Sequence, residues 1–167
     1  MNKMLKFKPD INLEQAISAM QGYSINHNVV KFNEKNVGRL VSNHNFYKYF
    51  LEPNGIEYQN IISKKLLPNE AIFIDKTQTL HIIRKKFADK FGITDEKLLT
   101  CSFQCHQYQK LIDAINKKNN LNVKLTYSYV LNDWFKQPMY EDTLEYITDV
   151  GCYYYFNEIS AKTIFGD

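Results

Sequence analysis

The chain contains few of the residues that interrupt regular structure or cross-link a chain. Of its 167 residues, six are Gly, four are Pro and three are Cys. The odd number of cysteines (Cys101, Cys105 and Cys152) argues against a disulfide framework. No further ligands are spaced to complete a zinc site around Cys101 and Cys105. We therefore expect buried free thiols, which behave as small apolar side chains.

Long apolar runs are also missing. The apolar stretches are short and interrupted by charge, so none is long enough to span a bilayer. Residues 1–10 (MNKMLKFKPD) contain no apolar segment of signal-peptide length. The length fits one domain, residues 1–167, with a core of its own. These features predict a globular cytoplasmic protein with no membrane partner.

Positive charge is concentrated in the first part of the chain. From residue 132 onward there are seven acidic residues and two lysines, a net charge of −5. Because the whole chain carries +3, residues 1–131 carry +8. Such a distribution suits a face that binds nucleic-acid phosphates, but a solvated and merely uneven surface has the same charge.

The first third of the chain is predicted to be mostly helical. Apolar residues at helical spacing predict a helix over residues 11–21, with Asp10 or Asn12 as its N-cap. Asn33 is interpreted as the cap of a second helix, which ends at Pro53-Asn54-Gly55 because proline interrupts the hydrogen bonding. Residues 56–62 have the composition of a strand.

The middle of the chain has the clearest strand patterns. Residues 71–75 and 80–87 are predicted strands joined by four residues, which is a hairpin length. The following elements are a helix from Thr94-Asp95 to about 118, a strand over 122–131, a helix over 139–149 and a strand over 152–157. The order α, α, β, β, β, α, β, α, β predicts an α/β (α+β) fold, with a mixed central β-sheet flanked by α-helices.

The two hairpin strands carry the residues that suggest a chemistry. Pro68-Asn69-Glu70 opens the first strand, and Arg84-Lys85-Lys86 ends the second. This arrangement resembles the signature of the PD-(D/E)XK nuclease superfamily, in which an Asp follows Pro on one strand and a Glu-x-Lys lies on the next. The stretch Gly92–Lys97 is similar to the Gly-x-x-Asp-Glu-Lys turn of bacterial type II restriction endonucleases. Residues 33–158 share the element order.

The resemblance implies a restriction-endonuclease-like fold and Mg²⁺-dependent, site-specific cleavage of double-stranded DNA by a homodimer. Phosphodiester hydrolysis of this kind uses a divalent metal held by hard oxygen ligands. A Lys two residues beyond the second acid lies on the same strand face, since side chains alternate, and it can position the attacking water.

The chain departs from the signature at both metal-ligand positions. Asn69 stands where the Asp belongs and Arg84 where the Glu belongs, whereas Lys86 is kept. An Asn offers a neutral carbonyl oxygen, but an Arg accepts no hydrogen bond and is always cationic. Cleavage is therefore expected to be impaired. Glu70 is the candidate substitute ligand, although a shift of one residue turns its side chain to the other face unless a bulge lies at Pro68.

Two roles are possible for the cationic residues near the signature. Arg84 contacts a phosphate in place of the metal, because its planar fork matches phosphate oxygens, or Arg84-Lys85-Lys86 is an ordinary solvated strand end. The further candidates for DNA contacts are Lys35, Lys64, Lys65, Lys85 and Lys97. His44, His81 and His106 have no catalytic spacing and are expected to be packing or surface residues.

Two functions follow from these residues. The first is a type II restriction endonuclease-like protein with an impaired metal site. The second is a DNA-binding protein without catalysis, such as the non-cutting subunit of a heterodimeric nuclease or a variant inactivated by design. A third class, an interaction module that binds no DNA, is disfavoured by the +8 of residues 1–131. Salt-dependent DNA binding separates this class from the other two.

Overall fold

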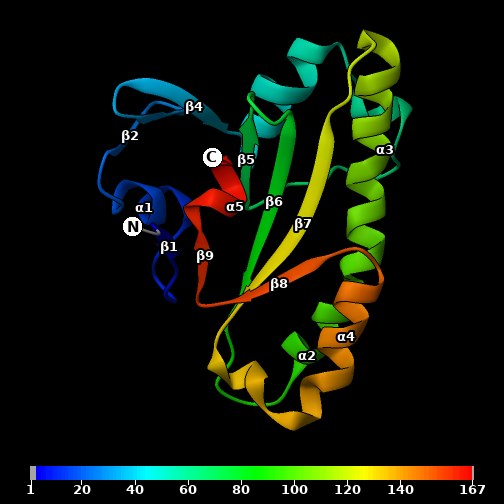
Figure 1. Ribbon diagram of the computed structural model, residues 1–167. Coiled ribbons are helices and arrows are strands. Elements are labelled where there is room, and N and C mark those ends of the chain that lie inside the picture. Colours follow the sequence, from blue (N-terminus) through cyan, green and yellow to red (C-terminus); the bar gives the residue numbers. More distant parts are fainter. Residues whose placement is uncertain (1–2, 167) are drawn as a thin grey trace.

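The computed structural model describes residues 3–166 and places seven strands in one mixed sheet (Figure 1). In spatial order these strands are β2 (Tyr23–Asn26), β3 (Val29–Phe32), β4 (Lys35–Leu40), β5 (Glu70–Ile74), β6 (Thr79–Lys86), β7 (Lys124–Leu131) and β8 (Tyr153–Phe156). The first five form an antiparallel meander, and β7 and β8 add in parallel to β6. The predicted mixed sheet is confirmed.

Helices precede or follow these strands and cover both faces of the sheet. They are α1 (Leu13–Ser18), α2 (Ile93–Lys97), α3 (Cys101–Asn119), α4 (Glu141–Asp149) and α5 (Ala161–Phe165). A π-helical turn over Tyr47–Leu51 and five short 3-10 turns complete the helical elements of residues 3–166. A separate pair, β1 (Met4–Lys6) with β9 (Glu158–Ser160), joins the two ends of the chain. No helix among residues 3–166 has the length and apolarity needed to cross a membrane.

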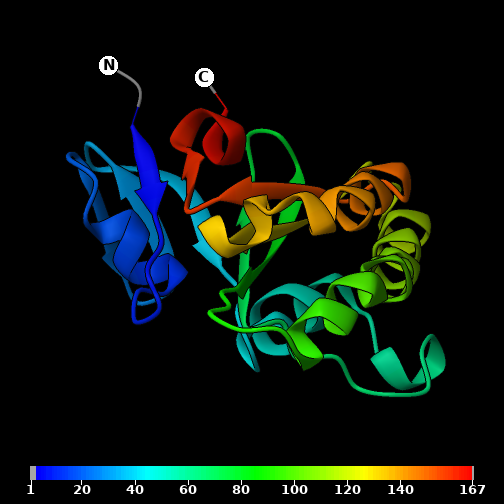
Figure 2. The same cartoon turned by 90° about the horizontal axis from the view of Figure 1, so that it is seen from below.

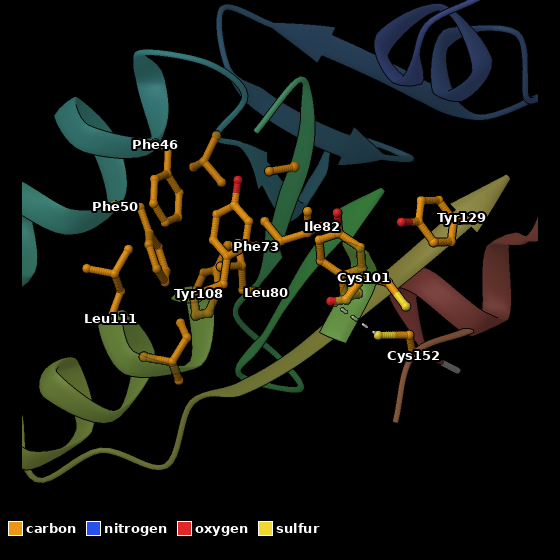
Figure 3. Packing of buried hydrophobic residues seen from close by; sticks show 14 of the residues in the cluster. Phe46, Phe50, Phe73, Leu80, Ile82, Cys101, Tyr108, Leu111, Tyr129 and Cys152 are labelled. Carbon is orange, nitrogen blue, oxygen red and sulfur yellow. Dashed lines mark hydrogen bonds between the residues drawn. The ribbon is translucent and has the colours of Figure 1, made fainter. Parts of the chain in front are cut away.

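Alternation along the central strands divides the buried residues into two cores. Phe73, Leu80 and Ile82 pack with α3, α4 and the Tyr47–Leu51 turn (Figure 3). Their neighbours Ile72 and Ile83 point the other way and pack with α1 and α5. Figures 1 and 2 show α3 and α4 on one side of the central strands, and α1 with the β1–β9 pair on the other. We call the surface toward α3 the α3 face and the opposite one the α1 face.

The hairpin predicted from residues 71–75 and 80–87 is confirmed. Strands β5 and β6 pair antiparallel from Glu70↔Ile83 to Ile74↔Thr79, and residues 75–78 connect them. The predicted helix from 94 to about 118 is interrupted by a 3-10 turn at 98–100, which divides it into α2 and α3. The strand predicted over 122–131 and the elements after it correspond to β7, α4 and β8.

Two predicted elements in the first third are wrong. Residues 33–50 are not one helix, because Asn33 and Glu34 adopt left-handed backbone conformations and form the two-residue turn between β3 and β4. Positive φ at both central residues is the requirement of a tight hairpin turn, and Asn tolerates it. Residues 56–62 are not a strand either, since only a 3-10 turn over Tyr58–Asn60 forms there.

The remaining small predictions are largely confirmed. Asn12 caps α1 with its side chain, and α1 is shorter than the predicted 11–21. The three cysteines are free thiols, of which Cys101 and Cys152 are buried and Cys105 is half-buried. His81 packs on the α1 face, where its Nδ1 lies 2.6 Å from the Thr126 hydroxyl.

Candidate nucleic-acid site

The open end of the β5–β6 hairpin brings the four predicted catalytic residues together. The β5–β6 ladder ends at the Glu70–Ile83 pair, so Asn69 lies one step beyond it, beside the Arg84 end of β6. Asn69, Glu70, Arg84 and Lys86 all line one small cavity of about 140 Å³. Phe7, Ile11, Asn12 and Lys85 complete its lining, so the segment before α1 forms one wall. We call this cavity the cationic pocket.

Strand alternation determines which of these side chains project from the same face of the sheet. Arg84 and Lys86 continue the series of Leu80 and Ile82, so they belong to the α3 face. Glu70 pairs with Ile83, a residue of the α1-face core, so Glu70 belongs to the α1 face. The flip expected for Glu70 from its position in the sequence is therefore present, and no bulge interrupts the β5–β6 ladder.

The α3-face side of the pocket is electrostatically uncompensated. Burial lowers the pKa of Lys86, and the nearby charges of Arg84 and Lys97 lower it further. Within residues 3–166, the ion pairs are Arg39–Asp75 and Lys136–Asp133, and neither includes a pocket residue. Arg84 and Lys86 are half-buried without a carboxylate partner. Arg84 and Lys86 line the pocket, and the charge of Lys97 acts on Lys86. Because Glu70 lines the pocket from the α1 face, the excess of positive charge lies on the α3-face side, where it favours an anion.

Tyrosines lie beside Arg84 on the same face. Strand β7 places Tyr129 next to Arg84, and Tyr127 and Tyr108 are buried nearby. Burial raises the pKa of Tyr127 to about 12, while the charge of Arg84 opposes this shift. These phenols therefore stay neutral near pH 7, and they do not cancel the charge of Arg84.

Glu70 is engaged on the α1 face. Its carboxylate accepts a hydrogen bond from the backbone N–H of Leu13, the first residue of α1. Burial raises the pKa of Glu70, whereas the Leu13 hydrogen bond and the charge of Lys85 lower it. The carboxylate of Glu70 is thus bonded to a helix N-terminus on the face opposite Lys86, an arrangement that does not favour it as a substitute metal ligand.

The residues present do not fit a magnesium ion. Among residues 3–166, no three His, Cys, Asp or Glu side chains converge in a way that could hold a metal. Magnesium is held mainly by hard oxygen ligands. The α3-face side of the cationic pocket offers the amide of Asn69 and the donor-only groups of Arg84 and Lys86.

Lys85, predicted to contact DNA, holds the chain segment before α1. Its ammonium donates to the carbonyl oxygens of Lys8, Pro9 and Ile11 at 2.7, 2.9 and 2.8 Å. The three bonds use the three donors of the ammonium group. Lys85 therefore stabilises the wall of the pocket and has no ammonium donor left for a ligand.

Replacing Lys85 by Met is expected to destabilise the fold by about 2 kcal/mol, because a charged donor to three carbonyls is removed while the aliphatic stem is kept. Urea denaturation measures the change in the free energy of unfolding. The control is Lys90→Met, since Lys90 is exposed in the loop after β6. Equal stability of the two variants would contradict the role assigned to Lys85.

The other predicted DNA contacts are spread over the surface. Lys97 ends α2, near Lys86. Lys35 is exposed in the β3–β4 hairpin, and Lys64 and Lys65 are exposed before β5. The Lys65 ammonium lies 4.6 Å from the centre of the Tyr47 ring. Only Lys97 is thus close to the cationic pocket.

Sequence reasoning missed the polar residues that line a second, larger cavity next to the first. This cavity is about 410 Å³ and shares Asn12, Asn69 and Glu70 with the cationic pocket. Its other lining residues are Glu14, His27, Asn28, Leu40, Ser42, Asn43, His44 and Asn45. The Asn- and His-rich composition of 26–28 and 43–45 was a visible signal, but the helix predicted from Asn33 to Pro53 assigned 43–45 to a helix rather than a loop.

No protein-family model, curated protein or solved structure matches this chain.

Proposed function

We propose that this protein binds duplex DNA through the cationic pocket and, because the metal-ligand positions are changed, holds the phosphodiester without cutting it. One observation carries the proposal. Arg84 and Lys86 project from alternate positions of β6 to the α3 face, close to Lys97, and no carboxylate pairs with them among the described residues. A DNA phosphate supplies the missing negative charge.

The arrangement of the elements supports the family interpretation. The signature positions lie at the open end of an antiparallel hairpin, and two helices then lead to strands that add in parallel. A mixed central sheet flanked by helices is compatible with the PD-(D/E)XK resemblance. The family chemistry requires carboxylates where the chain has Asn69 and Arg84, so binding without catalysis is the form of that function which these residues support.

The test is DNA affinity as a function of salt. We expect the wild-type protein to bind a duplex with a log–log slope near −0.9 for each phosphate contact. The double variant Arg84→Gln with Lys86→Gln should bind more weakly at low salt. Its log–log slope should be less negative by about two, because two phosphate contacts are removed. The control is Lys110→Gln with Lys117→Gln, because both lysines lie on α3 and Lys117 lines a different cavity.

Three outcomes are informative. A weakened double variant beside an unchanged control supports the proposal. An affinity that stays flat between about 50 and 200 mM salt would instead identify an interaction module that makes no phosphate contacts. Equal losses in the double variant and the control would show that binding is spread over the basic surface rather than centred on the pocket.

A homodimer is part of the proposal. Two copies related by a two-fold axis present two cationic pockets to a palindromic site, as the resemblance predicts. Sedimentation of the protein with and without a duplex measures this state, and a 1:1 complex on a symmetric duplex would contradict it.

A further inference from the structure

The larger cavity beside the cationic pocket, which we call the amide groove, is built from three separate parts of the chain. The tip of the β2–β3 hairpin contributes His27 and Asn28, and the loop after β4 contributes 42–45. Asn69 and Asn12 lie between this groove and the cationic pocket, since they line both. The two cavities are therefore adjacent, and one extended ligand could contact both.

The groove presents hydrogen-bonding groups that the protein leaves unused. The side chains of Asn28, Asn45 and Asn69 make no hydrogen bond to any described residue, and neither do those of His27 and His44. Asn28 is half-buried and the other four are exposed, so all five are accessible to a ligand. The half-buried amides of Asn116 and Asn132, by comparison, each bond to backbone atoms. An amide offers two donors and a two-lone-pair acceptor, so the groove can satisfy a polar ligand that carries both donors and acceptors.

The charges of the two cavities select different chemical groups. No Lys or Arg lines the amide groove, whereas Glu14 and Glu70 do, so an anion is disfavoured there. The cationic pocket next to it has the opposite preference. A nucleic acid offers this pair of chemistries side by side, because its backbone is anionic and its base edges are neutral donors and acceptors.

We infer that the amide groove reads base edges of the duplex whose phosphate occupies the cationic pocket, and that its carboxamides favour adenine. This inference rests on the proposed DNA binding. Asn pairs in bidentate fashion with N6 and N7 of adenine in the major groove. Phosphate contacts position a duplex but carry no sequence information directly, so preference must arise from groups such as these.

The experiment selects bound duplexes from a randomised library at moderate salt, where non-specific binding is reduced. The wild-type protein should enrich a motif that contains adenine, with about tenfold preference over a scrambled duplex. The double variant Asn28→Ala with Asn45→Ala should reduce that preference to about onefold while its low-salt affinity changes less than twofold. Neither residue has a left-handed backbone, unlike His27 and Asn43, so alanine introduces no backbone strain.

The control is Asn122→Ala, an exposed amide between α3 and β7, which should keep the wild-type preference. If Asn28→Ala with Asn45→Ala does not fold, the single variant Asn45→Asp provides the same test, because a carboxylate repels an adenine acceptor and shifts the selected base.

The outcomes separate the two proposals. No binding of any duplex overturns both the proposed function and the inference. Binding without sequence preference, a preference unchanged in the groove variants, or a motif without adenine overturns the inference alone. An adenine motif that is lost in the groove variant but kept in Asn122→Ala supports it.

Discussion

The double variant Asn69→Asp with Arg84→Glu is expected to cut duplex DNA in the presence of Mg²⁺, whereas the unmodified protein should leave the same duplex intact. The two substitutions place one carboxylate immediately before β5 and one on β6, at the open end of their ladder, with Lys86 two residues further along β6. Supercoiled plasmid nicking and linearisation, followed over time, measures the effect.

The size of the expected change follows from charge. A fixed guanidinium about 4 Å from a divalent ion repels it by roughly 8 kcal/mol at an effective dielectric of about 20. Changing Arg84 to Glu removes this repulsion and replaces it with attraction. Lys86 and Lys97 lie close enough to keep the new carboxylate ionised. Neutral changes such as a lost hydrogen bond are several-fold smaller than this term.

Matched variants test whether the restored carboxylates and Lys86 act together. Asn69→Asp alone keeps Arg84 and should stay inactive, and Lys86→Gln in the double variant should remove the restored cleavage. Glu70→Ala should lower stability but not remove restored cleavage, because Glu70 lies on the α1 face. Mg²⁺-dependent cutting by the unmodified chain would show that other ligands hold the metal. Its loss on Glu70→Ala would identify Glu70 as one of them.

Acidification from pH 7 to pH 4 is expected to destabilise the protein by about 3 kcal/mol through His81 alone. Burial lowers the pKa of His81 from 6.5 to about 4. The unfolded chain therefore takes up a proton below pH 6.5 that the folded chain takes up only near pH 4. Stability consequently falls as the pH drops through this interval and levels off below it.

Urea denaturation at several pH values measures this contribution by difference. His81→Gln keeps a polar partner for the Thr126 hydroxyl but does not titrate. The loss of stability between pH 7 and pH 4 should be smaller in this variant by about 3 kcal/mol. Parallel pH profiles for the two proteins would contradict the assignment of His81 as a buried neutral group.

Local patterns explain which parts of the fold the sequence predicts. The β5–β6 hairpin was predictable because Ala71–Ile74 and Leu80–Ile83 are mainly apolar runs separated by a short polar connector. The β3–β4 hairpin was not, since Asn33 favours a helix cap and a left-handed turn alike. Tertiary pairing of Arg39 and Leu40 with β5 decides between them.

For the site, the sequence predicts the strand face of each residue but not its long-range partners. A period of two puts Arg84 and Lys86 on one strand face and Glu70 on the other, and the structure places them so. The partners of Glu70 and Lys85 come from residues 8–13, far away in sequence, and no local pattern indicates them. The amide groove needs three distant segments to meet, and its residues have no distinctive spacing.

The β1–β9 pair has a consequence for the order in which the chain folds. Met4 pairs with Ser160, so this contact closes a loop that contains nearly the whole chain. Contacts of such sequence separation form late, since the loop-closure entropy is large. During synthesis the β2–β6 meander can assemble while β1 still lacks its partner. The segment before α1, one wall of the cationic pocket, is therefore fully anchored only after β9 has been made.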